Sequence, residues 1–219
     1  MKTTQNRLST AAIDSLNALS GDTLRFKPTC DLLRIWTKAL EAAHDHRFPG
    51  FDPLDAGGIL GHLYLLERDG ERLRYRVAGE AVNDLFGANH GGRYVDEVIA
   101  PSLQDVVEPF YHAVLRGTVC VFKGKVIVSA RRNAEFERIL LPIHRGGTVQ
   151  ILGSLSVSGT APLRDDGPIP HASEKGYHFV QIDPVTGRVT RTSIPHEDLP
   201  VDQLPYEDHL KRLPQGRRA

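Results

Sequence analysis

The chain has 219 residues, of which 40% are hydrophobic and 25% are charged, as is typical of a globular protein. Its 27 basic and 27 acidic residues cancel, which argues against a dedicated nucleic-acid binder, because such domains carry a basic excess. No run of about 18 apolar residues is present, so no membrane span is expected. The first residues lack a continuous apolar core, so we expect no secretory signal and a cytoplasmic location.

Two residue types that often build metal or redox sites are arranged here without the spacing such sites need. Cys30 and Cys120 are far apart and neither belongs to a CxxC pair, so we predict buried, reduced thiols. His44, Asp45 and His46 could hold a metal in principle, but a histidine at a helix end is already favoured by the helix dipole. We therefore predict no metal site.

The chain begins with a polar segment and a strongly amphipathic helix. Residues 1–30 are predicted to form an N-terminal arm with one weak helical pattern. A wide apolar stripe predicts a helix over 31–45. Its largest buried side chains are Leu33, Trp36 and Leu40. Burying each of them is worth about 1.5–3 kcal/mol, so the helix must be covered by a sheet or by a partner.

Two strands are predicted next, over 61–68 and 73–78, joined by a short loop. The second strand alternates strictly, with Leu73, Tyr75 and Val77 on one face and arginines on the other. This two-residue period is typical of a half-buried strand.

Helices and a glycine-rich loop follow the second strand. A short apolar helix is predicted over 81–86 and a turn-rich loop over 87–92. The loop matches neither a dinucleotide fingerprint nor a phosphate loop, so we interpret it as a turn. A longer helix is predicted from Ser102 to Gly117, with Pro109 inside it.

Three strands, over 119–128, 135–144 and 149–157, complete this unit, and the last two are joined by a tight glycine hairpin. The order of elements predicts an α+β domain, an antiparallel sheet with its helices gathered on one face. Residues 159–195 are interpreted as a linker and an appended hairpin, and residues 196–219 as a flexible tail.

Several short runs match one known family in order and spacing. They are Trp36 in the leading helix and the runs 47–49, 74–79, 87–93 and 137–143. On these residues the stretch 31–158 resembles a PAS domain, and more narrowly a branch of small stand-alone bacterial PAS proteins.

The resemblance implies a five-stranded antiparallel sheet with short helices on one face, an N-terminal helix and a C-terminal hairpin extension. It also implies a sensory role in signal transduction, with a pocket between the sheet and the short helices. A homodimer and a protein partner in a signalling pathway are expected. Known subtypes use flavin, haem or small organic ligands, and the cofactor here stays unknown. Flavin photosensors carry a cysteine on the short helix, and because residues 81–86 have none, no photosensing adduct is expected.

Alternation and aromatic content suggest which residues line the pocket. We predict a ligand-binding set of Tyr75, Val77, Phe86, Tyr94, Phe110, Leu141 and Leu155. We predict that the leading helix forms the dimer interface, through Trp36, Leu33 and Leu40.

Charged residues in the predicted sheet offer one further hypothesis. Glu137 and Arg138 point to opposite faces, and Glu137 shares its face with Ile139 and Leu141. A buried carboxylate needs a partner. Arg74 or Arg76 on the second strand could provide it as a structural ion pair.

Our interpretation is a non-enzymatic PAS-type sensory module that binds a small molecule, a partner protein or both, and signals through helix and dimer interface changes. One alternative is a small α+β cone-fold isomerase or hydratase with Asp96, Glu97 or His112 as acid or base. Another is a ligand-free interaction module. His90 and His112 were weighed as haem ligands, but solvent-facing or hydrogen-bonded histidines fit better. We predict no catalytic residue.

Overall fold

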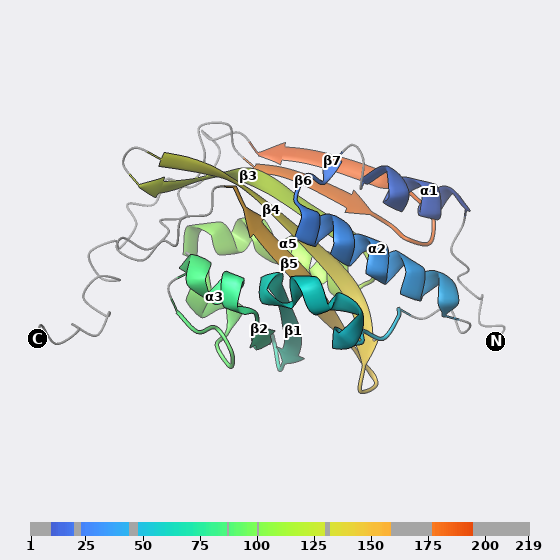
Figure 1. The fold of residues 1–219 in the computed structure, drawn as a ribbon, viewed down its shortest axis with the longest axis horizontal. Helices are drawn as coiled ribbons and strands as arrows, with labels where there is room; N and C mark the ends of the chain where they lie inside the picture. Colours follow the sequence, from blue (N-terminus) through green and yellow to red (C-terminus); the bar gives the residue numbers. More distant parts are fainter. Residues whose placement is uncertain are drawn as a thin grey trace, which may run out of the picture.

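The fold is a seven-stranded antiparallel sheet carrying helices on both faces (Figure 1). The computed structural model describes residues 10–19, 23–43, 48–86, 88–99, 101–129, 132–158 and 177–194. The strands are β1 (Leu63–Asp69), β2 (Arg72–Ala78), β3 (Val119–Ser129), β4 (Arg132–Arg145), β5 (Thr148–Val157), β6 (Tyr177–Ile182) and β7 (Val189–Ile194). Their spatial order is β2-β1-β5-β4-β3-β6-β7.

The helices connect or flank this sheet. They are α1 (Thr10–Ala18), α2 (Lys27–Ala42), the 3-10 segment η2 (Pro53–His62), α3 (Glu80–Phe86), α4 (Val95–Val98) and α5 (Pro101–Leu115). Helices α3 to α5 carry the chain from β2, at one edge, to β3. The predicted fold class is confirmed: β1 to β5 form the PAS-like sheet, with the N-terminal helix before it and the hairpin after it.

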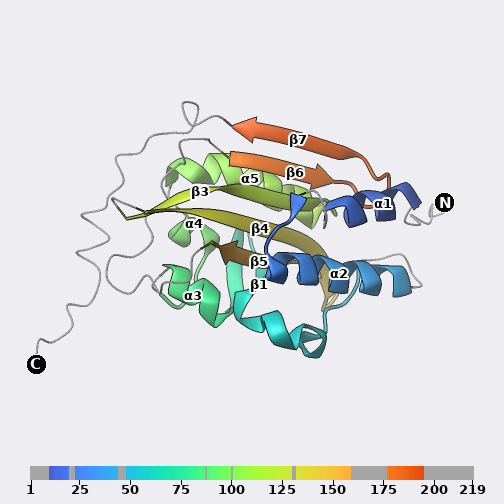
Figure 2. The same cartoon turned by 45° about the horizontal axis from the view of Figure 1, so that its top comes forward.

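Alternation along β4 divides the core into two layers. Ile139, Leu141 and Ile143 face α2, while Arg138 and Leu140 face the opposite side. Helix α2 packs on β4 and β5, and α5 packs on β3, β4 and β5 from the other side. Figure 2 shows α2 running along the sheet on one side and α3 to α5 on the other. The short helices thus cover one face, and the leading helix covers the other.

Helix α2 is fixed to the sheet by the apolar stripe that predicted it. Leu33 and Trp36 are almost fully buried, and Leu40 is 7% exposed. The indole Nε1 of Trp36 donates a hydrogen bond of 2.8 Å to the carbonyl oxygen of Pro142 on β4. These three side chains are core residues of one chain, so in this structure they are not exposed for the predicted dimer interface. An apolar stripe requires a cover, and here the cover is the chain's own sheet.

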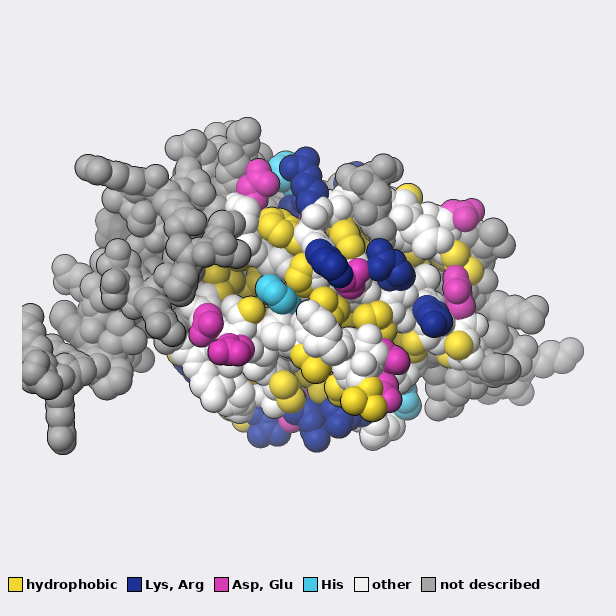
Figure 3. Space-filling view, viewed as in Figure 1, with side chains coloured by type: hydrophobic (Ala, Val, Ile, Leu, Met, Phe, Trp, Pro, Cys, Tyr) yellow, Lys and Arg dark blue, Asp and Glu magenta, His cyan; other side chains and the backbone are white. Residues whose placement is uncertain are grey.

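The outer side of α2 is polar. Asp31 pairs with Lys27 and, at 2.7 Å, with Arg34 on the surface of the helix. Figure 3 shows Lys and Arg side chains beside acidic ones on this face of the molecule. None of the helices in the described ranges combines the length and the apolar character that a membrane crossing requires.

The appended hairpin is an integral part of the sheet. Strand β6 pairs antiparallel with β3, and β7 pairs with β6 and forms the outer edge. Helix α1 docks on the turn of this hairpin, where Ser15 Oγ donates a hydrogen bond of 3.1 Å to the Gly187 carbonyl oxygen. Gly187 has a φ of +73°, and a Cβ there would lie 2.8 Å from Ala11 backbone atoms, so only glycine fits. The predicted linker and tail, and His44 to His46, lie outside the described residues.

Truncating Trp36 to alanine should lower the free energy of unfolding by about 3–5 kcal/mol, because it removes a large buried side chain. Trp36→Phe keeps an aromatic side chain and should cost less, about 1–3 kcal/mol, because it loses the indole hydrogen bond and part of the ring volume. Urea denaturation followed by circular dichroism measures both, since the chain has a single tryptophan and fluorescence is lost with it.

The molar mass of the folded Trp36→Phe variant, measured by light scattering, should equal that of the parent. A variant that keeps its stability but changes its mass would show that Trp36 belongs to an interface between copies.

Candidate functional site

Below α3, α4 and α5 lies a cluster of aromatic and polar side chains drawn from seven parts of the chain. We call it the inner cluster and define it as Tyr64, Tyr75, His90, Phe110, Tyr111, Phe122, Arg138 and Phe179. Except for Arg138, its members are at most 8% exposed. The cluster joins β1, β2, the loop after α3, α5, β3, β4 and the added strand β6.

One end of the inner cluster is a phenylalanine triad. Phe110 of α5 and Phe179 of β6 stack at 4.2 Å with an interplanar angle of 7°. Phe122 of β3 meets both rings edge-on, with centroids 5.3 and 5.0 Å away. Such pairs add about 0.5–1.5 kcal/mol each beyond their burial. The hairpin extension therefore contributes directly to the cluster.

The other end of the inner cluster is built from tyrosines. The rings of Tyr64 and Tyr75 lie 5.7 Å apart, and Tyr75 meets the ring of His90 at 5.5 Å. Tyr64 lies across Gly153 of β5, where a Cβ would come within 2.2 Å of Tyr64 Cζ. The glycine is thus what allows this ring to cross β5. Burial raises the pKa of both Tyr64 and Tyr75, so both are neutral phenols, and the Tyr64 hydroxyl has no hydrogen-bond partner.

His90 is held in the wall of the cluster by its own loop. Its backbone N–H donates to Asn83 Oδ1 at 3.0 Å, and its Nδ1 lies 2.7 Å from the carbonyl oxygen of Ala88. Because a carbonyl only accepts, Nδ1 carries the proton of the neutral ring. Burial lowers the pKa of His90. His112, the other histidine weighed as a haem ligand, is half-exposed on α5 and lies 3.2 Å from Glu108.

Arg138 places a permanent positive charge in the middle of the inner cluster. Its Nη1 donates a hydrogen bond of 2.8 Å to the Tyr111 hydroxyl, and its Cζ lies 5.7 Å from the centroid of the Tyr64 ring. Its Nε is shielded from solvent and has no hydrogen-bond partner among the described residues. No ion pair between described residues includes Arg138.

The predicted ligand-binding residues divide between the inner cluster and other places. Tyr75 and Phe110 belong to the cluster, and Leu155 packs against it from β5. Leu141 lies in the opposite layer, beneath α2. The side chain of Phe86 lies outside the described residues.

Two further members of that predicted set lie at the surface. Val77 is 54% exposed, because a bulge in β2 brings it opposite Leu65 instead of continuing the face of Tyr75. Tyr94 lies under the guanidinium of Arg72, 3.7 Å from its ring centroid, and its hydroxyl donates to Asp69 at 3.0 Å. Neither faces the inner cluster.

The groups weighed for acid–base catalysis point outward. Arg72 forms hydrogen bonds of 2.7 and 2.6 Å to Asp96 and of 2.9 Å to Glu97. The Arg72 guanidinium lowers the pKa of Asp96, so this carboxylate stays ionised. The inward-facing titratable pair that a cone-fold enzyme needs is therefore not formed by Asp96, Glu97 or His112.

A second polar centre lies in the opposite layer, at the start of α2. Glu137 is fully buried, as its alternation with Ile139 predicted. Its carboxylate accepts hydrogen bonds from the backbone N–H groups of Arg25 at 2.9 Å and Phe26 at 3.2 Å, and from the Thr29 hydroxyl. Lys123 Nζ lies 3.9 Å away. Glu137 therefore caps the N-terminus of α2 from the neighbouring sheet.

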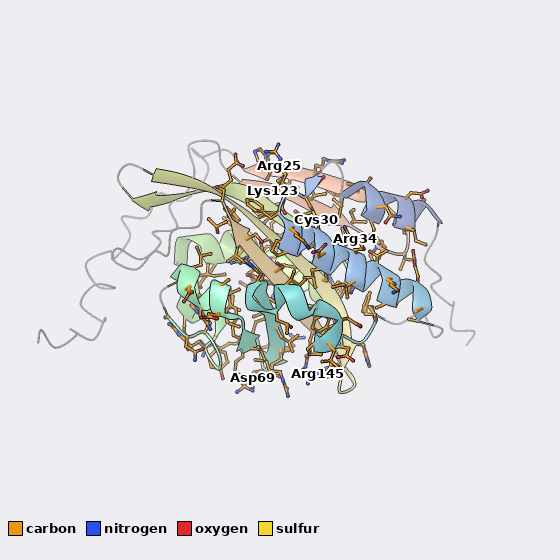
Figure 4. All side chains as sticks on the ribbon, in the orientation of Figure 1. Arg25, Cys30, Arg34, Asp69, Lys123 and Arg145 are labelled. Carbon is orange, nitrogen blue, oxygen red and sulfur yellow. The ribbon has the colours of Figure 1, made fainter. Side chains whose placement is uncertain are left out.

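The predicted partner of Glu137 was wrong. Arg74 and Arg76 both pair with Glu67, at 2.7 and 2.9 Å, near the edge of the sheet. The alternation of residues along the strand correctly predicted which face of the sheet Glu137 lies on. Its actual partners include backbone N–H groups, which every residue type except proline carries, so the sequence could not identify them. Figure 4 shows Arg25 and Lys123 near the start of α2, with Cys30 on the same helix.

Both cysteines are free thiols. Burial raises the pKa of Cys120 to about 12, so it is an unreactive thiol. Burial also raises the pKa of Cys30. Within the described ranges no group of three metal-ligating side chains comes together.

A five-stranded antiparallel sheet with short helices over a buried aromatic layer defines a PAS-type α+β fold. The family model of the PAS domain matches residues 24–156, which is more than half of the chain. The chain therefore belongs to the PAS domain family, as the resemblance of residues 31–158 predicted. Searches of curated proteins and of solved structures returned no match. PAS domains are in general sensory and regulatory modules without enzymatic activity.

Replacing Glu137 by glutamine should lower the free energy of unfolding by about 2–4 kcal/mol, because it removes the charge that two backbone N–H groups and Thr29 share. The matched control is Glu135→Gln on the same strand. Its side chain is 51% exposed and lies 3.8 Å from Arg25, so it should change stability by less than about 0.5 kcal/mol. Urea denaturation compares the two, and equal effects would refute the capping role of Glu137.

Proposed function

We propose that the protein is a non-enzymatic cytoplasmic sensor that binds a small molecule at the inner cluster and reports it through the docking of the hairpin and α1. Membership of the PAS domain family supports the sensory class. The observation that carries the ligand-binding part is the inner cluster itself, where Arg138 Nε and Tyr64 Oη are buried and find no hydrogen-bond partner in the described part of the chain. Buried polar atoms are nearly always paired in proteins, so unpaired ones in one cluster suggest a missing partner.

The hairpin provides a physical route out of the inner cluster. Phe179 of β6 stacks on Phe110 of α5, so a ligand that displaces α5 acts on β6 directly. The turn of the same hairpin holds α1 through the contact of Ser15 with Gly187. A bound molecule would therefore shift the equilibrium between docked and undocked positions of α1.

A changed position of α1 and the hairpin would be read by another chain. Strand β7 is the open edge of the sheet, and residues 190–193 on it are exposed. An edge strand offers unpaired backbone groups to a second copy or to a partner protein. Because Leu33, Trp36 and Leu40 are core residues, we propose this edge as the dimer surface in their place.

The proposal is tested on the full chain, freshly purified under native conditions and again after unfolding, dialysis and refolding. Native mass spectrometry should show a mass above that of the chain in the first sample and the bare chain in the second. Hydrogen exchange should be faster in residues 11–18 and 177–194 of the refolded sample, because the stacked triad loses its support.

The variant Phe179→Leu keeps an apolar side chain but removes the stacking. It should therefore abolish the difference in α1 hydrogen exchange between the native and the refolded sample. Val82→Ala, a core change on α3, should leave that difference in place. A protein that carries no small molecule, binds none and shows no difference would refute the sensor and favour a pure interaction module.

A further inference from the structure

Arg138 lies inside the sheet without a carboxylate partner among the described residues, whereas six arginines at the surface have one. These six are Arg25, Arg34, Arg68, Arg72, Arg74 and Arg76. Arg138, which faces the inner cluster, forms no ion pair with a described residue and uses one of its five N–H groups, in the hydrogen bond to Tyr111. Other described arginines without an ion pair, such as Arg116 and Arg145, are exposed to water, so Arg138 is distinguished by lacking a carboxylate partner at an inward position.

The neighbours of Arg138 cannot neutralise it. Burial raises the pKa of Tyr64 and Tyr75, so these phenols stay uncharged. His90 is a neutral ring or, if protonated, a second cation. An arginine stays charged at every accessible pH, and a buried charge without a counter-ion is strongly destabilising. The inner cluster is thus short of one negative charge.

The unused edge of the guanidinium suggests what would supply that charge. Nε is enclosed and without a partner, and Nη2 forms no hydrogen bond with any described residue. These two nitrogens form a planar fork that matches the two oxygens of a carboxylate. Arg138 as a whole residue is partly exposed, whereas its Nε is shielded from solvent.

The surroundings limit the charge and the shape of the ligand. One guanidinium balances one negative charge, whereas a phosphate dianion would leave a second charge uncompensated in an apolar layer. Phe110, Phe122, Leu140 and Leu155 provide apolar surface around the polar centre. The hydroxyl of Tyr64, which has no partner, is a further donor.

We propose that the inner cluster binds an organic monocarboxylate, with Arg138 holding the carboxylate and the phenylalanine end of the cluster contacting an apolar tail. Tyr111 acts as a positioning residue, since its hydroxyl fixes one end of the guanidinium. This inference rests on the proposed sensor function and names the chemical class of its ligand.

The test uses the full chain after removal of co-purifying molecules, with octanoate and phenylacetate as probes. Their uncharged amides and inorganic phosphate serve as controls. Isothermal titration calorimetry and thermal unfolding should show that each carboxylate binds at least tenfold more tightly than its amide, and that phosphate does not bind.

Arg138→Met should weaken octanoate binding at least tenfold, and Arg138→Lys should restore part of it, because a lysine keeps the charge but lacks the fork. Arg76→Met, which removes a surface arginine paired with Glu67, should leave binding unchanged. Tyr111→Phe keeps the ring and serves if Arg138→Met does not fold. It should weaken carboxylate binding more than amide binding.

Equal binding of acids and amides, or binding that survives Arg138→Met, would overturn this inference while leaving the sensor function intact. Preferential binding of phosphate would overturn the monocarboxylate. If no probe binds, the molecule released from the native protein decides. A released molecule that carries a carboxylate supports the inference, and a released molecule without an acidic group overturns it. A native protein that releases no molecule overturns the proposed sensor function as well.

Discussion

The architecture depends on two adjacent charges of β4 that the pleat of the strand sends to opposite faces of the sheet. Glu137 points beneath α2, and Arg138 points beneath α5. A charge in either layer is costly unless it finds a partner. The chain supplies partners for the first charge from the start of α2, and it supplies one tyrosine hydroxyl for the second. This asymmetry separates a structural face from a face suited to a ligand.

The structural face explains how the leading helix is placed. Helix α2 has no side chain that caps its own start, and Glu137 provides that cap from the sheet while Trp36 bonds to Pro142 farther along. The helix is thereby fixed at two points along its length. The opposite layer is built differently, from α3, α4, α5 and a loop, and β6, the strand next to the edge strand β7, contributes Phe179. Short helices such as α3 and α4 open at lower free energy than long ones, which is compatible with the ligand binding that we propose at this face.

Much of the fold followed from simple patterns, because burial on one side leaves a periodic trace in the sequence. The alternation in β2, β4 and β5 and the apolar stripe of α2 gave the strands and the leading helix. The hairpin was also predicted, although its pairing with β3 was not, since strand partners at the edge of a sheet leave no local signal. An apolar stripe is the same for a core helix and an interface helix, which is why Trp36 was assigned to a dimer.

The candidate site was harder to predict because its residues depend on which face of the sheet is covered by α3 to α5 and which is covered by α2. Leu141 and Leu155 both alternate correctly, but only Leu155 points toward the short helices. Val77 lies on a different face from Tyr75 because of a bulge in the pairing of β1 and β2. The bulge changes the register of the strands, but the alternation of apolar and charged residues in the sequence does not reveal it. Alternation predicted that Arg138 and Glu137 lie on opposite faces of the sheet. A charged residue at an inward-facing strand position was the pattern that could have identified Arg138 as a site residue.

The most direct test compares the two charges in the ligand-free protein. Arg138→Met and Glu137→Leu each replace a charged side chain of β4 with an apolar one of similar size, and urea denaturation measures both. The account predicts that Arg138→Met is at least as stable as the parent chain, because an unpaired charge is removed. It predicts that Glu137→Leu loses about 2 kcal/mol or more, since buried donors lose their acceptor. A comparable loss in Arg138→Met would show that Arg138 stabilises the fold and would contradict the account.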